Sequence, residues 1–353
     1  MIARFRLREA AGLRRFSYPV RTAFSSTAPA ASMRLLEEGK PVPAQFTQRD
    51  GGLVELDFNA AMAPLEVRNY TIEEGAGPRP AAAVAVEETP ASFLIRGGGG
   101  VLFDVPRNLL GFLNAARTQG LNFVRPGSFG LGLVYRDDIL YRAGGVSHWG
   151  EATRAAVIKP GPLCAGLRFE STEGLRGSRT VASVVEMHFP RSKSWVEVIW
   201  TVDDPEGLVT GLLADLHLDV AGPPLLVDFG ASSMVYAVLR KEPAITFDAT
   251  GEGWAIDLAG ERYAAGAGAP EGWAHVMDRE RATAAAVAEF DQFNPPARSR
   301  IEIHAGGRLL LRRDVTRGRE NTLRFWLHFV SMPVQIGAAT SPQSMLSPLR
   351  VEW

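Results

Sequence analysis

The feature that most constrains the fold is a run of strand-like segments between residues 163 and 220. Four segments follow one another with turns between them: LCAGLRFEST, TVASVVEMHF, SWVEVIWTVDD and GLLADLHLDV. In the third segment Val196, Val198 and Trp200 alternate with their neighbours, which is the period of a strand with one buried face. Four consecutive long strands predict one large antiparallel sheet, and hence a β-sandwich or barrel.

The rest of the chain also favours a mostly β fold. Its 353 residues include 36 Gly and 23 Pro, which suits many short strands joined by turns. Residues 1–75 alternate in the strand manner and predict a small N-terminal antiparallel domain, barrel-like in character. Residues 76–92, rich in Ala and Pro, predict a linker. Residues 93–353 then form the large antiparallel β-sandwich, with a clear hairpin at Gly306-Gly307.

Two segments predict departures from this pattern, so we expect one or two short helices. Residues 108–120, NLLGFLNAARTQG, space their apolar side chains as in a short amphipathic helix that ends at Gly120. Residues 275–290 are rich in Ala, the best helix former, and are a candidate for the one substantial helix of this half. A strand is the competing interpretation, because Val276, Val287 and Phe290 do not settle the period.

Charge and hydropathy exclude several classes of partner. The formal net charge is -1, with no polybasic region to attract nucleic acid or anionic lipid, so we expect neither a nucleic-acid nor a membrane partner. No run approaches the roughly 20 apolar residues of a membrane span. The N-terminus has no apolar segment typical of a secretory signal, which predicts a soluble, bacterial-type cytoplasmic protein. A mature secreted chain whose signal had been removed would look the same.

The sequence predicts neither a metal site nor a cofactor. Cys164 is the only cysteine, so no intrachain disulfide can form, and its apolar flank predicts a buried, inert thiol. The six histidines form no pair at metal-ligand spacing. Asp137-Asp138 and Asp203-Asp204 are carboxylate pairs in loops, where the oxygen ligands of calcium are often found, but ordinary solvated turns are the favoured explanation for both pairs.

The densest group of chemically useful side chains lies between residues 271 and 293. His275 and Asp278 are three residues apart and would share one face of a helix. A carboxylate beside an imidazole assists a general base, and Arg281 would neutralise a substrate carboxylate. The alternative is an ordinary solvated helix start, with Asp278 as its N-cap.

Aromatic residues near histidines give a second set of candidates. His148 lies in a polar loop, GGVSHWGE, and is a further candidate general base, because loops carry function more often than strands do. Trp149 and Trp273 each lie within two residues of a histidine and are expected to stack on sugar rings. Tyr135 and Tyr141 flank the Asp137-Asp138 turn and are expected to line a cleft.

Two regions carry a resemblance to known proteins. The segments RRFSYPV, LLEEGKPVPAQF, LVELDF and APLEVRNYTIEEG resemble the N-terminal RIFT barrel of exo-acting rhamnogalacturonan lyase-like proteins. GPLCAGLRFES and SWVEVIWTVDDPEG resemble the wide-sheet supersandwich of polysaccharide lyases and mutarotase-like enzymes. The resemblance implies a carbohydrate-active protein, one that cleaves acidic sugars by β-elimination, but it assigns no catalytic residue to a position of this chain.

Three functions follow as hypotheses. The first is a carbohydrate-active enzyme, a lyase or glycoside hydrolase acting on an oligosaccharide or polysaccharide. The second is a non-catalytic carbohydrate-binding module, in which the same tryptophans stack on sugar. The third is a scaffold protein that forms a homo-oligomer through sandwich edges and the segment WLHFVSMPVQIG.

Overall fold

A computed structural model of the chain describes residues 1–97, 100–135, 145–148, 152–175, 179–291, 298–315, 321–332 and 342–353. The protein is mostly β, with 62% strand and 4% helix, which confirms the predicted fold class. The described helices are α1 (Pro342–Leu346) and two 3-10 turns, Ala30–Ser32 and Asp50–Gly52. None of the helices in the described part of the chain has the length and apolar character needed to cross a membrane.

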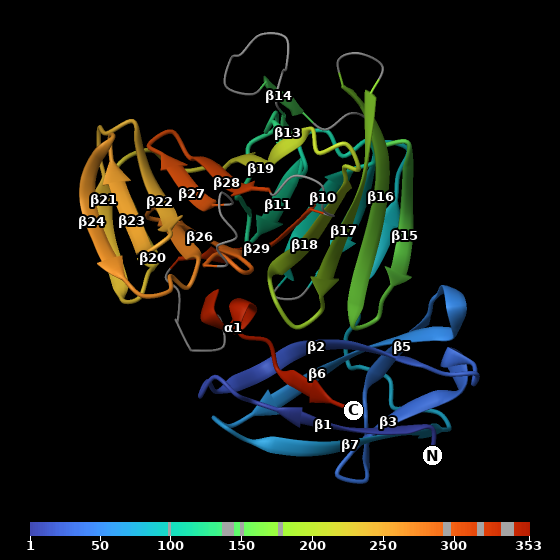
Figure 1. Ribbon diagram of the computed structural model, residues 1–353. Helices are drawn as coiled ribbons and strands as arrows, with labels where there is room; N and C mark the ends of the chain where they lie inside the picture. Colours follow the sequence, from blue (N-terminus) through green and yellow to red (C-terminus); the bar gives the residue numbers. More distant parts are fainter. Residues whose placement is uncertain are drawn as a thin grey trace.

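An N-terminal unit combines residues 1–75 with the last strand of the chain (Figure 1). Its first sheet has five strands, in the order β30 (Arg350–Glu352), β1 (Ala3–Arg8), β7 (Val67–Glu74), β3 (Met33–Glu37) and β4 (Lys40–Val42). Its second sheet has three, in the order β2 (Arg15–Ser25), β6 (Leu53–Met62) and β5 (Ala44–Gln48). Apolar side chains from both sheets, such as Phe5 and Phe58, form its core.

The large sandwich is built on a nine-stranded antiparallel sheet. Its strands are, in order, β15 (Arg154–Pro160), β16 (Cys164–Leu175), β17 (Arg179–Pro190), β18 (Trp195–Asp203), β29 (Asn321–Ser331), β26 (Arg281–Val287), β25 (Trp273–Met277), β20 (Leu225–Gly230) and β21 (Met234–Leu239). In β18 the side chains of Val196, Val198 and Trp200 enter the sandwich core, as their alternation predicts. Trp195 and Glu197 of the same strand therefore lie on the other face, called the outer face below.

Two further sheets cover the inner face of the nine-stranded sheet. One has eight strands, in the order β14 (Gly145–His148), β13 (Gly130–Tyr135), β19 (Val209–His217), β28 (Arg308–Asp314), β27 (Ser299–His304), β22 (Ala244–Thr250), β23 (Gly253–Leu258) and β24 (Glu261–Ala267). The other has five, in the order β12 (Leu121–Asn122), β11 (Ala115–Thr118), β10 (Leu102–Pro106), β9 (Ser92–Arg96) and β8 (Ala85–Glu88). Ring pairs join the layers: Phe103 lies 5.0 Å from Phe189, and Phe229 lies 5.3 Å from Phe247.

Strand order differs from chain order at several places. The fourth segment of the run 163–220 does not continue the sheet of the other three, because β19 crosses to the eight-stranded sheet and pairs with β13 and β28. The segment 76–92 contains β8, which pairs with β9. The hairpin predicted at Gly306-Gly307 is confirmed by the pairing of β27 with β28.

The helix predicted over residues 108–120 is wrong. Leu109 and Phe112 have φ angles of 58° and 65°, in the left-handed region that interrupts a helix. Both side chains are buried in the sandwich core, and burial of this tight turn outweighs helix propensity. The chain then enters β11, which pairs with β10.

The alanine-rich segment 275–290 is also strand rather than helix, as the competing interpretation had it. β25 and β26 form a hairpin in the middle of the nine-stranded sheet. Ala274 and Val276 face the core, whereas Trp273 and His275 face outward, so the period is two. The hairpin is paired with β20 on one side and with β29 on the other, and this pairing outweighs the helix propensity of the alanines.

Candidate functional site

The outer face of the nine-stranded sheet carries several cavities in the described part of the chain. The N-terminal unit and α1 lie against this face (Figure 1). Strand register places one row of residues side by side across six strands. In order from β18 to β21 the row is Trp195, His328, Ala284, His275, Asp228 and Tyr236.

Small side chains on β26 create a cleft in this row. Ala282 and Ala284 form its floor, between His328 on β29 and His275 on β25. Because methyl groups are flanked by large rings on both sides, the surface is hollowed along β26. The cleft has a volume of about 360 Å³. Its lining residues are Asp228, Met234, Tyr236, Trp273, His275, Met277, Ala282, Ala284, His328, Val330, Met332, Pro342 and Gln343.

A close contact between Trp273 and Gly230 fixes the shape of one wall. A Cβ at Gly230 would lie 2.0 Å from Nε1 of Trp273, so only glycine leaves room for the indole. The indole N–H donates to Oε2 of Glu271, which holds the ring in place. With 3% of its surface exposed, Trp273 offers the cleft an edge rather than an open stacking platform.

His275 and Asp228 form a hydrogen-bonded pair inside the cleft. Nδ1 of His275 lies 2.8 Å from Oδ1 of Asp228, on the neighbouring strand. A carboxylate only accepts, so Nδ1 carries the proton and Nε2 keeps a lone pair. The indole of Trp273 meets the imidazole edge to face at 5.2 Å. This arrangement holds the imidazole ring of His275 in one orientation.

Two other predicted catalytic residues lie at the β25–β26 turn. Oδ1 of Asp278 accepts the backbone N–H groups of Glu280 and Arg281, both at 2.7 Å. Nε of Arg281 donates to the carbonyl of Asn122 at 2.8 Å. Neither residue lines the cleft, and these contacts fix the turn and tie it to β12.

The remaining predicted residues lie on the other large sheet or outside the described ranges. Tyr135, at the end of β13, packs against the sandwich core. His148 is the last residue of β14, opposite Gly132, and only its backbone is described. Trp149 and Tyr141 lie outside the described residues. The structure thus brings together His275 and Trp273 and adds Asp228, Tyr236 and His328.

The sequence does not identify Asp228 as a site residue, because it lies 47 residues before its partner His275. The segment LLVDFG has the pattern of an ordinary strand. Its single carboxylate among apolar residues is the only feature of the sequence that points to a functional role for Asp228. His328, in LRFWLHFV, gave the same kind of signal. A polar residue in an otherwise apolar strand marks an outward position, but the facing partner depends on strand order.

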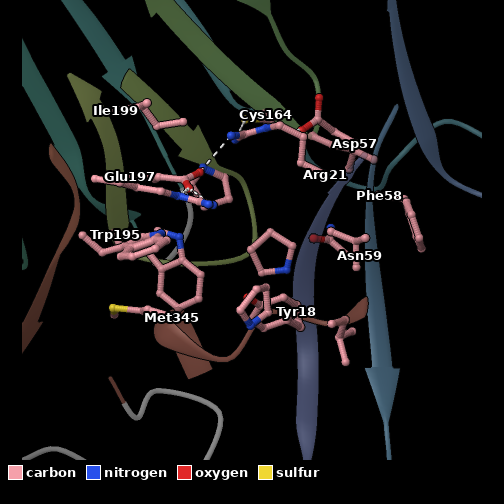
Figure 2. A pocket seen from close by; sticks show the side chains of 18 residues that line it. Tyr18, Arg21, Asp57, Phe58, Asn59, Cys164, Trp195, Glu197, Ile199 and Met345 are labelled. Atoms are coloured by element: carbon pink, nitrogen blue, oxygen red, sulfur yellow. Dashed lines mark hydrogen bonds and ion pairs between the residues drawn. The ribbon is translucent and has the colours of Figure 1, made fainter. Parts of the chain in front are cut away.

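A second cavity, of about 220 Å³, lies between the outer face and the N-terminal unit (Figure 2). Glu197 and Trp195 stand on the β18 side, and Arg21, Asp57, Asn59 and Tyr18 come from β2 and β6. Nη1 of Arg21 donates to Oε2 of Glu197 at 2.8 Å. The two units are therefore joined by a partly buried ion pair.

Burial and charge set the ionisation of groups at this cavity. Burial opposes ionisation of Glu197, but the charges of Arg21 and Arg324 outweigh it and lower the pKa of Glu197 to about 2. Burial, reinforced by Asp57, raises the pKa of Cys164 to about 11. Cys164 is 3% exposed, so the predicted buried thiol is confirmed and its raised pKa favours the unreactive form.

No metal cluster is found in the part of the chain that the structure describes. No group of three or more His, Cys, Asp or Glu side chains there has the geometry of a metal site. Asp204, one of the considered calcium ligands, accepts the N–H of Val209 at 2.7 Å and so holds a turn. Asp137 and Asp138 lie outside the described residues.

No protein-family model and no curated protein sequence matches the chain. Among solved structures, it is similar to an α-mannosidase from Enterococcus faecalis V583, with 9% identity over 99% of this chain and 45% of that one, and a TM-score of 0.60. A glycosyl hydrolase family 38 protein from Enterococcus faecalis gives 9% identity, 99% and 47% coverage and a TM-score of 0.56.

The chain therefore spans less than half the length of either neighbour. At 9% identity these likenesses show a shared β fold. The resemblance to RIFT-barrel lyases remains a prediction from the sequence.

Proposed function

We propose that the protein is carbohydrate-active and that His275 takes a proton from a sugar bound in the cleft along β26. The observation that carries the proposal is the 2.8 Å bond from Nδ1 of His275 to Asp228 within a hollow of about 360 Å³. The shared fold with an α-mannosidase supports carbohydrate as the ligand class. Catalysis needs an oriented base beside a space for substrate, and the cleft provides both.

The described lining favours a neutral sugar. Among the described lining residues there is no Arg or Lys, so a sugar carboxylate would lack a cationic partner in this cleft. Tyr236 is 65% exposed at the rim and offers a flat ring for stacking against the apolar face of a pyranose. Met234 and Met277 extend the apolar wall and adapt to irregular shapes.

Proton transfer by one base fits the cleft better than hydrolysis by two carboxylates. Hydrolysis commonly requires a pair of carboxyl groups about 5–10 Å apart. Asp228 is the only carboxylate among the described lining residues, and it already accepts from His275. We therefore propose a reaction that needs one base, such as isomerisation of a neutral sugar.

The test is a product screen with purified protein and neutral and acidic oligosaccharides, read by mass spectrometry and ultraviolet absorbance. A product of unchanged mass indicates isomerisation, an unsaturated product indicates a lyase, and addition of water indicates a hydrolase. His275→Gln should abolish turnover and move the melting temperature by less than about 2 °C. Full turnover by this variant would remove His275 from the mechanism.

A matched control exists on the other sheet. His304 on β27 also pairs with a carboxylate, Glu302, and is also partly exposed. His304→Gln should keep full turnover. Asp228→Asn should lower turnover less than His275→Gln does, because the imidazole remains but loses its fixed tautomer.

A non-catalytic carbohydrate-binding module is the second candidate, favoured by the apolar lining and by exposed Tyr236. It predicts a sugar-dependent rise in melting temperature without any product. In that case Tyr236→Ala should abolish the rise, whereas His275→Gln should leave most of it.

The scaffold hypothesis receives less support from the fold. The described part of WLHFVSMPVQIG, residues 326–332, runs through β29 in the middle of the nine-stranded sheet rather than along an edge.

A further inference from the structure

The outer face of the nine-stranded sheet carries an exposed apolar row beside the His275 cleft. Strand register places Leu226 of β20 between Met277 of β25 and Val238 of β21. Each of the three lies two positions along its strand from a member of the row that contains His275, so all of them share the outer face. Met277, Leu226 and Val238 are called the apolar strip below.

The apolar strip leaves a large share of its surface in contact with water. Leu226 is 53% exposed and Val238 is 39% exposed. Met234, which lines the cleft two residues before Tyr236, is 51% exposed. Single exposed apolar residues are common, but a contiguous group of them at the rim of a cavity is typical of a binding groove. The position of the strip therefore points to a ligand that extends out of the cleft.

The cleft itself is poor in groups that bind hydroxyls. Seven of its thirteen described lining residues are Met, Val, Ala or Pro. Among the polar ones, Trp273 already donates its indole N–H to Glu271. Oδ1 of Asp228 is already bonded to His275. A chain of unsubstituted sugar rings would place many hydroxyls against methyl and thioether groups, and a hydroxyl that leaves water without gaining a partner opposes binding.

Polar and apolar groups are separated across this surface. His275 and Asp228 form the polar pair, and the apolar strip runs parallel to their row, two residues or about 7 Å away along the strands. The described lining and the strip contain no Arg or Lys, so an anionic group would have no cationic partner there. A ligand with hydroxyls on one part and an uncharged hydrocarbon on another part matches both regions.

We propose that the His275 cleft binds a neutral sugar that carries an uncharged hydrocarbon substituent, and that this substituent lies over the apolar strip. The inference rests on the proposed function, because it names the substrate class of the same site. Met277 lines the cleft and also belongs to the strip, so the two parts of the site are continuous. Leu226 is the central contact for the substituent, because Met277 and Val238 flank it on either side.

The experiment measures the binding of methyl, butyl and hexyl glucosides and mannosides to the full chain by titration calorimetry. Complete burial of one methylene group strengthens binding about fourfold, and half burial about twofold. At half burial the hexyl glycosides should bind about fourfold more tightly than the butyl glycosides and about thirtyfold more tightly than the methyl glycosides. Equal affinities for the methyl and hexyl glycosides would overturn the inference and leave the proposed function intact.

Variants assign the gain in affinity to the apolar strip. Leu226→Thr should weaken hexyl glycoside binding by about fourfold or more and leave methyl glycoside binding unchanged, because Leu226 contacts only the substituent. Val238→Thr, which replaces a methyl group by a hydroxyl of similar size, should act in the same direction. Leu53→Thr is the matched control: Leu53 is 38% exposed at the start of β6 in the N-terminal unit, so this change should leave every affinity unaltered.

Circular dichroism confirms that each variant is folded before titration, and an unchanged dependence on chain length in folded Leu226→Thr and Val238→Thr would overturn the inference. So would the absence of saturable binding by every glycoside.

Two further measurements separate the inference from its alternatives. 1-Hexanol should bind about tenfold or more weakly than the hexyl glycosides. Equal binding would keep the strip as an apolar site but show that the cleft recognises no sugar, which would contradict the proposed function. Light scattering of the ligand-free protein provides the second measurement. A dimer that Leu226→Thr dissociates would show that the strip joins two copies of the chain, and this result would overturn the inference.

Discussion

Replacing Glu197 by Gln should lower the free energy of unfolding by about 3 kcal/mol at neutral pH. The pKa of Glu197 falls from 4.5 to about 2 in the folded protein, because the charges of Arg21 and Arg324 outweigh the effect of burial. Each pH unit between the folded and unfolded values corresponds to about 1.4 kcal/mol, which gives about 3 kcal/mol in total. The side chain is 9% exposed, so solvent screens little of this interaction.

The same arithmetic predicts how the effect depends on pH. A carboxyl group whose folded pKa is depressed stabilises the protein fully above its unfolded pKa, and this contribution disappears as the pH falls through the folded pKa. Between pH 5 and pH 2 the difference between wild type and Glu197→Gln should therefore shrink. At pH 3 we expect about 1.5 kcal/mol, roughly half of the value at pH 7.

Urea denaturation at pH 7 and pH 3, followed by tryptophan fluorescence and circular dichroism, measures both values. Coincident transitions by the two probes are required before a single free energy is assigned. Glu73→Gln is the control. Glu73 pairs with Arg34 at a partly exposed site, where such pairs contribute at most about 1 kcal/mol. A loss below about 1 kcal/mol for Glu197→Gln at pH 7, or an equal loss at both pH values, would refute the reasoning.

Three further predictions follow from other contacts. Ala284→Leu should fill the floor of the cleft and abolish sugar binding while leaving the melting temperature nearly unchanged, because the added methyl groups enter open space. Gly230→Ala should destabilise the protein by about 1–3 kcal/mol in urea denaturation, since its Cβ would meet the Trp273 ring at 2.0 Å, whereas Gly306→Ala meets no atom within 4 Å and should be nearly neutral. Cys164, whose pKa burial raises to about 11, should resist alkylation at pH 8 in the folded protein and react at once in urea; rapid alkylation of the native chain would contradict this.

Sequence reasoning located part of the candidate site. The window 271–293 stands out in the sequence for its dense mixture of aromatic and charged residues, and His275 and Trp273 do line the cleft. The three-residue spacing predicts Asp278 as the partner of His275, on a shared helix face. In the structure the segment is a hairpin, and Asp278 instead caps its turn. The partner is Asp228, from a strand paired across the sheet.

The sequence by itself determined the fold class and the face on which many side chains lie. Alternation with period two separates Val196, Val198 and Trp200 from Trp195 and Glu197, because successive side chains of a strand point to opposite faces. The same rule explains why Trp273 and His275 share a face. The face on which a side chain lies follows from its own strand alone, so it can be predicted without knowing which strands lie beside it.

Only the tertiary structure decided which strands are neighbours, and with them the site. β29 is inserted between β18 and β26, which places His328 beside Trp195 on one side and Ala284 on the other. β20 lies next to β25 and brings Asp228 to His275. Strand order depends on how whole layers bury their apolar faces together, an energy summed over distant segments. The secondary-structure propensity of a short segment does not depend on distant segments, so it cannot predict strand order. The cleft forms only when the strands of the sheet are assembled in that order.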